Sequence, residues 1–209
     1  MKNYIKNLKL LTKNHVYSKE MEHDACGVGA IVSTEGKKSR IIVEYGIEAL
    51  KAVWHRGAVD ADGKTGDGAG IHLEIPKDFF IEKIEVTGHD YDNSEICVGM
   101  IFLPRNDYSA QESCKTIVES ELTKNNFSIY GWRQVPVNPK ILGQKAIQTM
   151  PEIMQVLFKS NDKNLLDKNL ERKIYETRKK IENKAFELSL NNFYICSISS
   201  KSIIYKGLY

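Results

Sequence analysis

The chain has 209 residues, of which 42% are hydrophobic and 27% are charged. This composition is typical of a globular protein with enough apolar residues for one core. The 30 lysine and arginine residues exceed the 27 aspartate and glutamate residues by only three, which gives a formal net charge of +3. A charge this small does not indicate a nucleic acid or an anionic membrane as partner.

The sequence contains neither a secretion signal nor a membrane-spanning segment. Residues 1–13 are rich in lysine, but no uninterrupted apolar stretch of about 7 residues follows them. No segment approaches the roughly 20 apolar residues that cross a bilayer. The four cysteines contain no C-x-x-C pair, so a structural metal site is not predicted. We expect a cytoplasmic protein with reduced thiols at Cys26, Cys97, Cys114 and Cys196.

The first predicted elements follow a polar, lysine-rich segment that ends near residue 25. The apolar run 26–32 predicts a buried strand. Apolar residues at helical spacing then predict an amphipathic helix over residues 40–54. A loop rich in glycine and aspartate, residues 58–68, separates this helix from a second predicted strand at 69–75.

The rest of the chain predicts a mixture of strands and helices. Both faces of residues 95–103 are apolar, which is typical of a central strand covered on both sides. The pattern then predicts a helix, a strand, a long helix and a closing hairpin, over residues 107–124, 127–137, 165–188, 193–199 and 202–206. Strands with helices grouped between them favour α+β layering. Because the sequence stops directly after a strand, we expect a fragment of a domain.

Cys26 opens the first apolar run and is the candidate nucleophile. A cysteine at the start of a buried strand is most often a small hydrophobic residue. If the chain were cut before Cys26, however, the thiol would lie beside its own α-amino group, whose reference pKa of about 7.7–8.0 is close to the thiol's value of about 8.5. One residue would then supply both nucleophile and base, as an N-terminal threonine does with its own amine.

His55, Arg56 and Gly57 follow the predicted helix and allow two interpretations. A cation is favoured at a helix C-terminus by the helix dipole, and glycine is a common residue just after a helix. Alternatively, Arg56 helps to order an active site and Gly57 lets the backbone approach a substrate. Sequence spacing alone leaves both interpretations open.

The loop that follows matches no phosphate-binding or calcium-binding pattern. The Gly-Lys-Thr run at 63–65 resembles the end of a P-loop, but the preceding glycine is one residue too far away, and a helix rather than a strand leads into it. Asp60, Asp62 and Asp67 lack the bidentate glutamate that closes an EF-hand loop. We interpret the three aspartates as solvated turn residues.

Five segments together resemble the start of the glutamate synthase large chain. They are EHDACGVG at 22–29, HRGAVDADG at 55–63, TGDGAGI at 65–71, GWRQVPV at 131–137 and IIYKG at 203–207. The resemblance implies a class II glutamine amidotransferase domain with the N-terminal-nucleophile hydrolase fold. This is an α+β, four-layer αββα sandwich, which we expect to be incomplete at its C-terminus. The resemblance further implies a propeptide at 1–25 and a truncated domain at 26–209.

By the same resemblance, Cys26 is the nucleophile, and Arg56 and Gly57 match the motif that the family places at its active site. The implied enzyme activity is the glutaminase half-reaction of glutamate synthase, in which the side-chain amide of L-glutamine is hydrolysed and ammonia is supplied for glutamate synthesis from 2-oxoglutarate. No cofactor or metal is expected in this chain, whereas FMN and an iron–sulfur cluster are implied for the full-length enzyme. The implied partners are the downstream synthase domains and a small electron-transfer subunit, with neither nucleic acid nor membrane.

The groups that would complete the reaction bear on the activity of this chain alone. The family forms its oxyanion hole with an Asn-Gly pair in a His-Asn-Gly-Glu motif and holds glutamine with an arginine and an aspartate, all downstream. No Asn-Gly dipeptide occurs in this sequence. The alternatives are therefore a glutaminase, a catalytically incompetent fragment of that domain, and an N-terminal-cysteine amidase that acts on another amide. The segment HRGAVDADG argues against the last of these.

Overall fold

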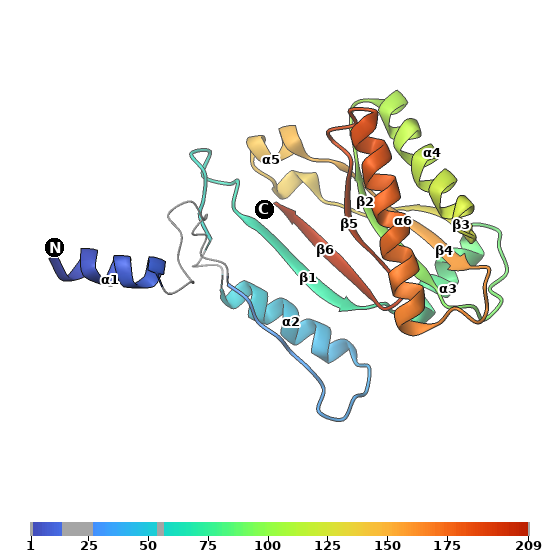
Figure 1. Cartoon of the computed structure of the whole chain (residues 1–209), viewed down its shortest axis with the longest axis horizontal. Coiled ribbons are helices and arrows are strands. Elements are labelled where there is room, and N and C mark those ends of the chain that lie inside the picture. Colours follow the sequence, from blue (N-terminus) through green and yellow to red (C-terminus); the bar gives the residue numbers. More distant parts are fainter. Residues whose placement is uncertain (1, 14–26, 54–56, 209) are drawn as a thin grey trace.

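The computed structural model describes residues 2–13, 27–53 and 57–208 of the chain. Its strands form two antiparallel sheets, one of four strands and one of two, and the two longest helices lie together on an outer face of the larger sheet (Figure 1). Strands and helices do not alternate strictly along the chain. The α+β class predicted from the sequence is therefore confirmed.

The larger sheet has the strand order β3-β4-β2-β5, and all neighbouring strands in it are antiparallel. Its strands are β2 (Cys97–Leu103), β3 (Phe127–Gln134), β4 (Glu152–Ser160) and β5 (Tyr194–Ser199). All residues of β2 except Phe102 are buried. The central strand predicted over residues 95–103 is thereby confirmed, because only a strand covered on both faces buries both sets of alternating side chains.

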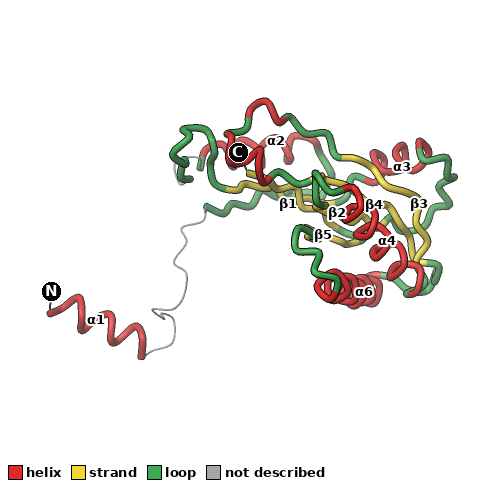
Figure 2. Tube along the Cα trace, turned by 90° about the horizontal axis from the view of Figure 1, so that it is seen from above, coloured by secondary structure: helices red, strands yellow, loops and turns green. Residues whose placement is uncertain are grey.

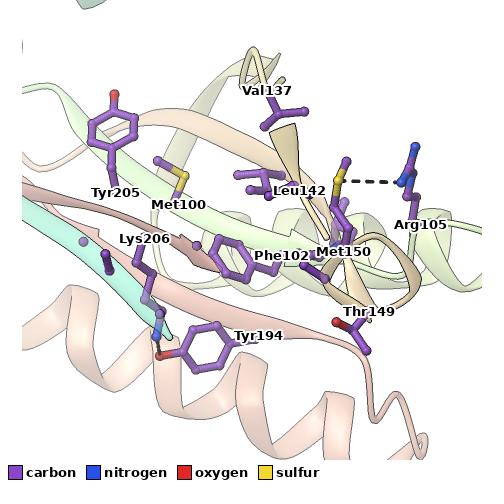
Figure 3. Close-up of a pocket in the computed structure, with 18 of the residues that line it drawn as sticks. Met100, Phe102, Arg105, Val137, Leu142, Thr149, Met150, Tyr194, Tyr205 and Lys206 are labelled. Carbon is purple, nitrogen blue, oxygen red and sulfur yellow. Dashed lines mark hydrogen bonds between the residues drawn. The ribbon is translucent and has the colours of Figure 1, made fainter. Parts of the chain in front are cut away.

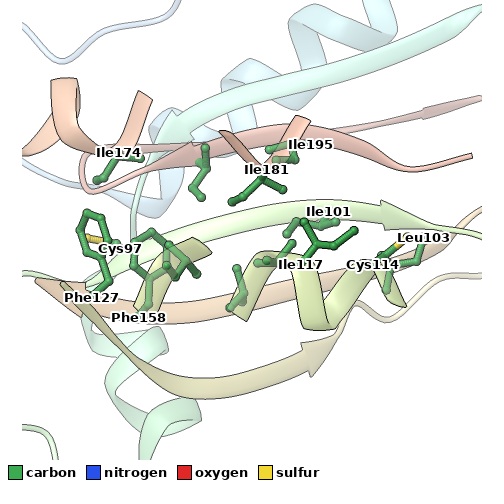
Figure 4. Close-up of a cluster of buried hydrophobic side chains, with 14 of the residues drawn as sticks. Cys97, Ile101, Leu103, Cys114, Ile117, Phe127, Phe158, Ile174, Ile181 and Ile195 are labelled. Carbon is green, nitrogen blue, oxygen red and sulfur yellow. The ribbon is translucent and has the colours of Figure 1, made fainter. Parts of the chain in front are cut away.

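Two helices, α4 (Tyr108–Lys124) and α6 (Asp167–Glu187), cover one face of the larger sheet. Asp107 caps α4, because its carboxylate accepts a hydrogen bond of 2.9 Å from the backbone N–H of Ala110. The side chains between these helices and the sheet form the first core cluster (Figure 4), which contains Cys97, Ile101, Leu103, Cys114, Ile117, Val118, Leu122, Phe127, Val156, Phe158, Leu170, Ile174, Ile181, Ile195 and Ile198.

The smaller sheet pairs β1 (Gly68–Glu74) with β6 (Ser202–Leu208) in antiparallel register, and α2 (Arg40–Ala52) packs on β1. Gly46 permits this packing, because a Cβ atom there would lie 3.3 Å from Cδ1 of Ile71. The Ser39 side chain caps α2 by accepting a hydrogen bond from the backbone N–H of Ile41.

A second core cluster joins the two sheets. It contains Val98 and Met100 of β2, Leu157 of β4 and Ile203 of β6, together with Phe80 and Ile84 of α3 (Lys77–Val86). The order of the layers is therefore α2, the β1·β6 sheet, the four-stranded sheet, and then α4 with α6 (Figure 2). This arrangement confirms the αββα sandwich that the resemblance implies.

The prediction of a buried strand over residues 26–32 is wrong for its described part. Residues 27–32 form no strand and are exposed, with Val28 at 91%. An apolar run becomes a strand only where a neighbouring strand satisfies its backbone N–H and C=O groups. No strand in the described ranges pairs with this run.

Several elements are absent from the sequence prediction, namely α3, β4, the helices α1 (Lys2–Lys13) and α5 (Gln144–Thr149), and the 3₁₀ turn η2 (Pro139–Ile141). In β4 the apolar pattern is interrupted by Gln155, which is fully buried nevertheless. The Gln155 side chain is satisfied there, since it accepts a hydrogen bond from Arg133 at 2.7 Å and donates one to the Tyr205 hydroxyl at 3.1 Å.

Candidate functional site

A cleft of about 1720 Å³ opens between the two sheets. One wall consists of β1 and β6, and the other consists of β2 and the start of β5. The segment 136–151, which connects β3 to β4, lines a further side (Figure 3). Ligand pockets for drug-sized molecules usually measure about 300–1,000 Å³, so this cleft is larger than a site shaped around one amino acid.

The cleft is mainly apolar, with polar groups at its edge. Met100, Phe102 and Tyr205 are among the residues that line it. At the edge, the Lys206 ammonium donates a hydrogen bond of 2.8 Å to the Tyr194 hydroxyl and lies 4.3 Å from the centre of the same ring. Lys206 is therefore held by an aromatic partner through both a hydrogen bond and a cation–π contact.

A compact loop, residues 57–67, leads into β1 at one end of the cleft. Its two arms are joined by the bridge between Val59 and Gly66 and by a hydrogen bond of 2.8 Å from the Asp60 N–H to the Thr65 carbonyl. The Asp67 carboxylate accepts a further hydrogen bond from the N–H of Ala58, also at 2.8 Å. The loop is therefore folded by its own backbone and aspartates rather than being an open turn.

Asp62 organises the tip of this loop. Its carboxylate accepts hydrogen bonds from the hydroxyl and the backbone N–H of Thr65, at 2.5 and 2.7 Å, and from the backbone N–H of Lys64 at 3.0 Å. These bonds hold the pKa of Asp62 well below its usual range. The three aspartates thus lie in a turn, as predicted. The Asp62 carboxylate, however, accepts hydrogen bonds from several protein donors and is not simply solvated.

The loop is tied to the segment 143–145. The Lys145 ammonium lies 2.7 Å from both carboxylate oxygens of Asp60, and this contact lowers the pKa of Asp60. The backbone at Gly143 also lies close to Asp62. Gly143 allows this approach, because a Cβ atom on it would lie 2.5 Å from Oδ2 of Asp62. Sequence reasoning missed Lys145 and Gly143, since no local pattern connects residues that are 85 positions apart.

Two of the three candidate catalytic residues, Cys26 and Arg56, lie outside the described residues, whereas Gly57 is described and exposed at the start of the loop. Their described neighbours are in contact: a Cβ atom on Gly27 would lie 3.3 Å from Cβ of Val53. Gly27 directly follows Cys26, and Val53 directly precedes residues 54–56. The fold therefore brings Gly27 and Val53 together at the C-terminal end of α2.

The other three cysteines are buried free thiols. Burial raises the pKa of Cys97 far above its usual value and raises that of Cys114 to about 11. Burial also raises the pKa of Cys196. Because the thiolate is the reactive form, these cysteines are poor nucleophiles at neutral pH. The reduced thiols expected at these three positions agree with the structure.

Neither a membrane span nor a metal site emerges from residues 2–13, 27–53 and 57–208. No helix within these ranges combines the length and the apolar character needed to cross a membrane. The same ranges contain no group of three or more His, Cys, Asp and Glu side chains arranged to hold a metal ion.

Comparison with known proteins places residues 26–209 in a match to the family model for class-II glutamine amidotransferases. The chain is 52% identical to the glutamate synthase [NADPH] large chain of Azospirillum brasilense over 203 residues, which cover 97% of this chain and 13% of that protein. It is 40% identical to ferredoxin-dependent glutamate synthase 1 of Arabidopsis thaliana over 189 residues, which cover 90% of this chain and 12% of the relative. The chain therefore spans only about an eighth of the length of these relatives.

Proposed function

Because the chain belongs to the class-II glutamine amidotransferase family, we propose that it is the glutaminase part of a glutamate synthase and that Cys26 is its nucleophile. The observation that carries this proposal is that the family match starts at residue 26, the cysteine directly before the exposed run 27–32. In this proposal residues 1–25 are a propeptide, and the mature domain begins at Cys26.

After cleavage, the α-amine of Cys26 takes the proton of its own thiol. The resulting thiolate attacks the side-chain carbonyl carbon of glutamine, and a C–S bond forms as the carbonyl oxygen becomes an oxyanion. The protonated amine gives its proton to the amide nitrogen. The oxyanion then reforms the carbonyl as the C–N bond breaks, ammonia departs, and a thioester remains on Cys26. Water then adds to the thioester, the C–S bond breaks, and glutamate is released with the thiol restored.

Arg56 and Gly57 act in this proposal as the groups that order the site around the thiol. Support comes from the contact between Gly27 and Val53, which sets the residue after Cys26 against the residue before the segment 54–56. Gly57 then begins the folded loop 57–67, so its backbone position is determined by that loop. A glycine there leaves its N–H accessible to a substrate.

The ammonia would serve glutamate synthesis from 2-oxoglutarate in further domains of the parent enzyme, with a small electron-transfer subunit as partner and the cytoplasm as the compartment. FMN and an iron–sulfur cluster would belong to those domains. The described part of this chain does not fit such a cluster, because it contains no group of three or more Cys, His, Asp and Glu side chains arranged to hold a metal ion.

The second candidate is a catalytically incompetent fragment of the same domain. It is favoured by the lack of an Asn-Gly dipeptide in the sequence. Removal of one oxyanion donor typically lowers the rate by about 100–1,000-fold. A chain that matures correctly but lacks these donors would therefore turn over glutamine very slowly.

Labelling with an electrophilic glutamine analogue tests the proposal. Intact mass should show loss of residues 1–25, and the analogue should modify Cys26, with protection by glutamine and no modification of Cys26→Ala. The same assay on a chimaera, in which residues 1–209 replace the matching segment of the Azospirillum brasilense relative, separates the two candidates. If the analogue labels the chimaera but not the chain of 209 residues, this chain is an incompetent fragment. A mature Cys26 that ignores the analogue in both proteins sinks the proposed function and favours an amidase with another substrate.

A further inference from the structure

We propose that Lys145 is a positioning residue for the active site, because its side chain fixes the loop 57–67 to the segment 143–145. The inference deepens the proposed function and rests on it for the role of Gly57 and of the adjoining Arg56. Its structural basis is independent of activity, since it consists of contacts between described residues only.

The hydrogen bonds of the loop show how it is connected to the rest of the fold. Within residues 57–67, the backbone hydrogen bonds and the Asp62 and Asp67 side-chain bonds to neighbouring N–H groups are internal to the loop. Among the described residues, the hydrogen bonds that leave the loop run from the Lys145 ammonium to the Asp60 carboxylate. Together with the close packing at Gly143, this contact holds the folded loop against the segment 143–145.

α5 carries Lys145 and begins beside the loop. A Cβ atom on Gly143, the residue before α5, would lie 2.5 Å from Oδ2 of Asp62. This close approach therefore requires glycine at position 143, and it packs the start of α5 directly against the loop.

The segment that contains α5 also forms part of the wall of the cleft. The segment 136–151 lines the cleft, and Figure 3 shows Leu142, Thr149 and Met150 of this segment among the lining residues. Because Lys145 lies in the same segment, the wall of the cleft and the loop that begins at Gly57 are mechanically connected. A change in the position of this wall would be transmitted to the backbone of Gly57.

The contact is suited to positioning rather than to global stability. The side chains of Lys145 and Asp60 are 59% and 38% exposed, and exposed ion pairs contribute little to the stability of a fold. Loss of the pair should therefore leave the two core clusters intact. Its effect should be confined to the local opening of the loop.

Hydrogen exchange of the whole chain tests the contact without requiring activity. In Lys145→Met, the amides of Asp60, Gly63 and Asp67 should exchange about two- to five-fold faster than in the wild type, as expected for loss of one exposed charge pair. Lys145→Arg should restore slow exchange. Lys140→Met, which removes an exposed lysine from the same segment, should behave as the wild type. Unchanged exchange in Lys145→Met would overturn the inference.

Labelling of Cys26 then tests the role in the site. In the chimaera with the Azospirillum brasilense relative, Lys145→Met should slow modification by the glutamine analogue at least several-fold, while iodoacetamide reacts at the wild-type rate and Lys145→Arg recovers the analogue rate. An analogue rate equal to that of the wild type would refute the positioning role. If the wild-type chimaera itself ignores the analogue, the proposed function fails, and the exchange measurement still decides whether Lys145 fixes the loop.

Discussion

Phe158 provides a direct test of where the stability of this chain resides. The residue lies in β4 with no exposed surface, and it packs edge-on against Phe127 with ring centroids 5.3 Å apart. Phe→Ala substitutions in cores typically cost about 3–5 kcal/mol, including the cavity left behind. We expect a loss near the middle of that range, about 4 kcal/mol, for Phe158→Ala. Since small domains are stable by only about 5–15 kcal/mol, most of the margin could be removed.

Urea unfolding measures this loss. Trp132 packs against the same core cluster and reports its unfolding by fluorescence. The midpoint should fall strongly while the slope of free energy against urea concentration stays unchanged. Phe186→Ala is the matched control, because Phe186 is 84% exposed on α6 and surface substitutions change stability by about 0.5 kcal/mol or less. A loss below about 1.5 kcal/mol for Phe158→Ala would show that the layer formed by α4 and α6 is not the main source of stability.

Three further outcomes are expected. Hydrogen bonds from two lysines lower the pKa of Glu121 in the folded chain, so its stabilising effect is present above its unfolded pKa and is lost as the pH falls through the folded value. Acid unfolding curves of the wild type and Glu121→Gln should therefore draw together as the pH falls below the ordinary glutamate pKa of about 4.3; curves that stay equally far apart at every pH would contradict this. Gly99→Ala would set a Cβ atom 2.6 Å from Cγ1 of Val156 and should cost about 1–3 kcal/mol in urea unfolding, whereas Gly207→Ala, with no atom within 4 Å, should cost far less, and equal losses would refute the packing argument. A thiol reagent at neutral pH should modify the buried residues Cys97, Cys114 and Cys196 only after unfolding, so rapid modification of any of these three in the folded chain would count against their burial.

Periodic apolar patterns predicted much of this fold, because the side chains that a helix or a strand buries recur at a regular spacing in its own sequence. The run at 95–103 became the central strand β2, since both of its faces are apolar. The long helix expected at 165–188 is α6, which buries a stripe of residues three to four positions apart. The family motifs could also be recognised, because the chemistry proposed for Cys26 and for the segment 55–57 depends on residues that are close in the sequence.

Tertiary structure decided the features in which distant residues meet. Gln155 interrupts the apolar pattern of β4, so that pattern did not predict the strand. Its side chain can be buried only because Arg133 of β3 and Tyr205 of β6 form hydrogen bonds with it. The apolar run at 27–32 remains exposed, since an apolar sequence does not by itself provide the neighbouring strand that its backbone needs. The contact of Lys145 with Asp60 joins residues 85 positions apart, and no local pattern contains it. The sequence by itself determined the family and the periodic elements, whereas the cleft and the anchoring of the loop 57–67 depend on packing between layers, which exists only once the chain has folded.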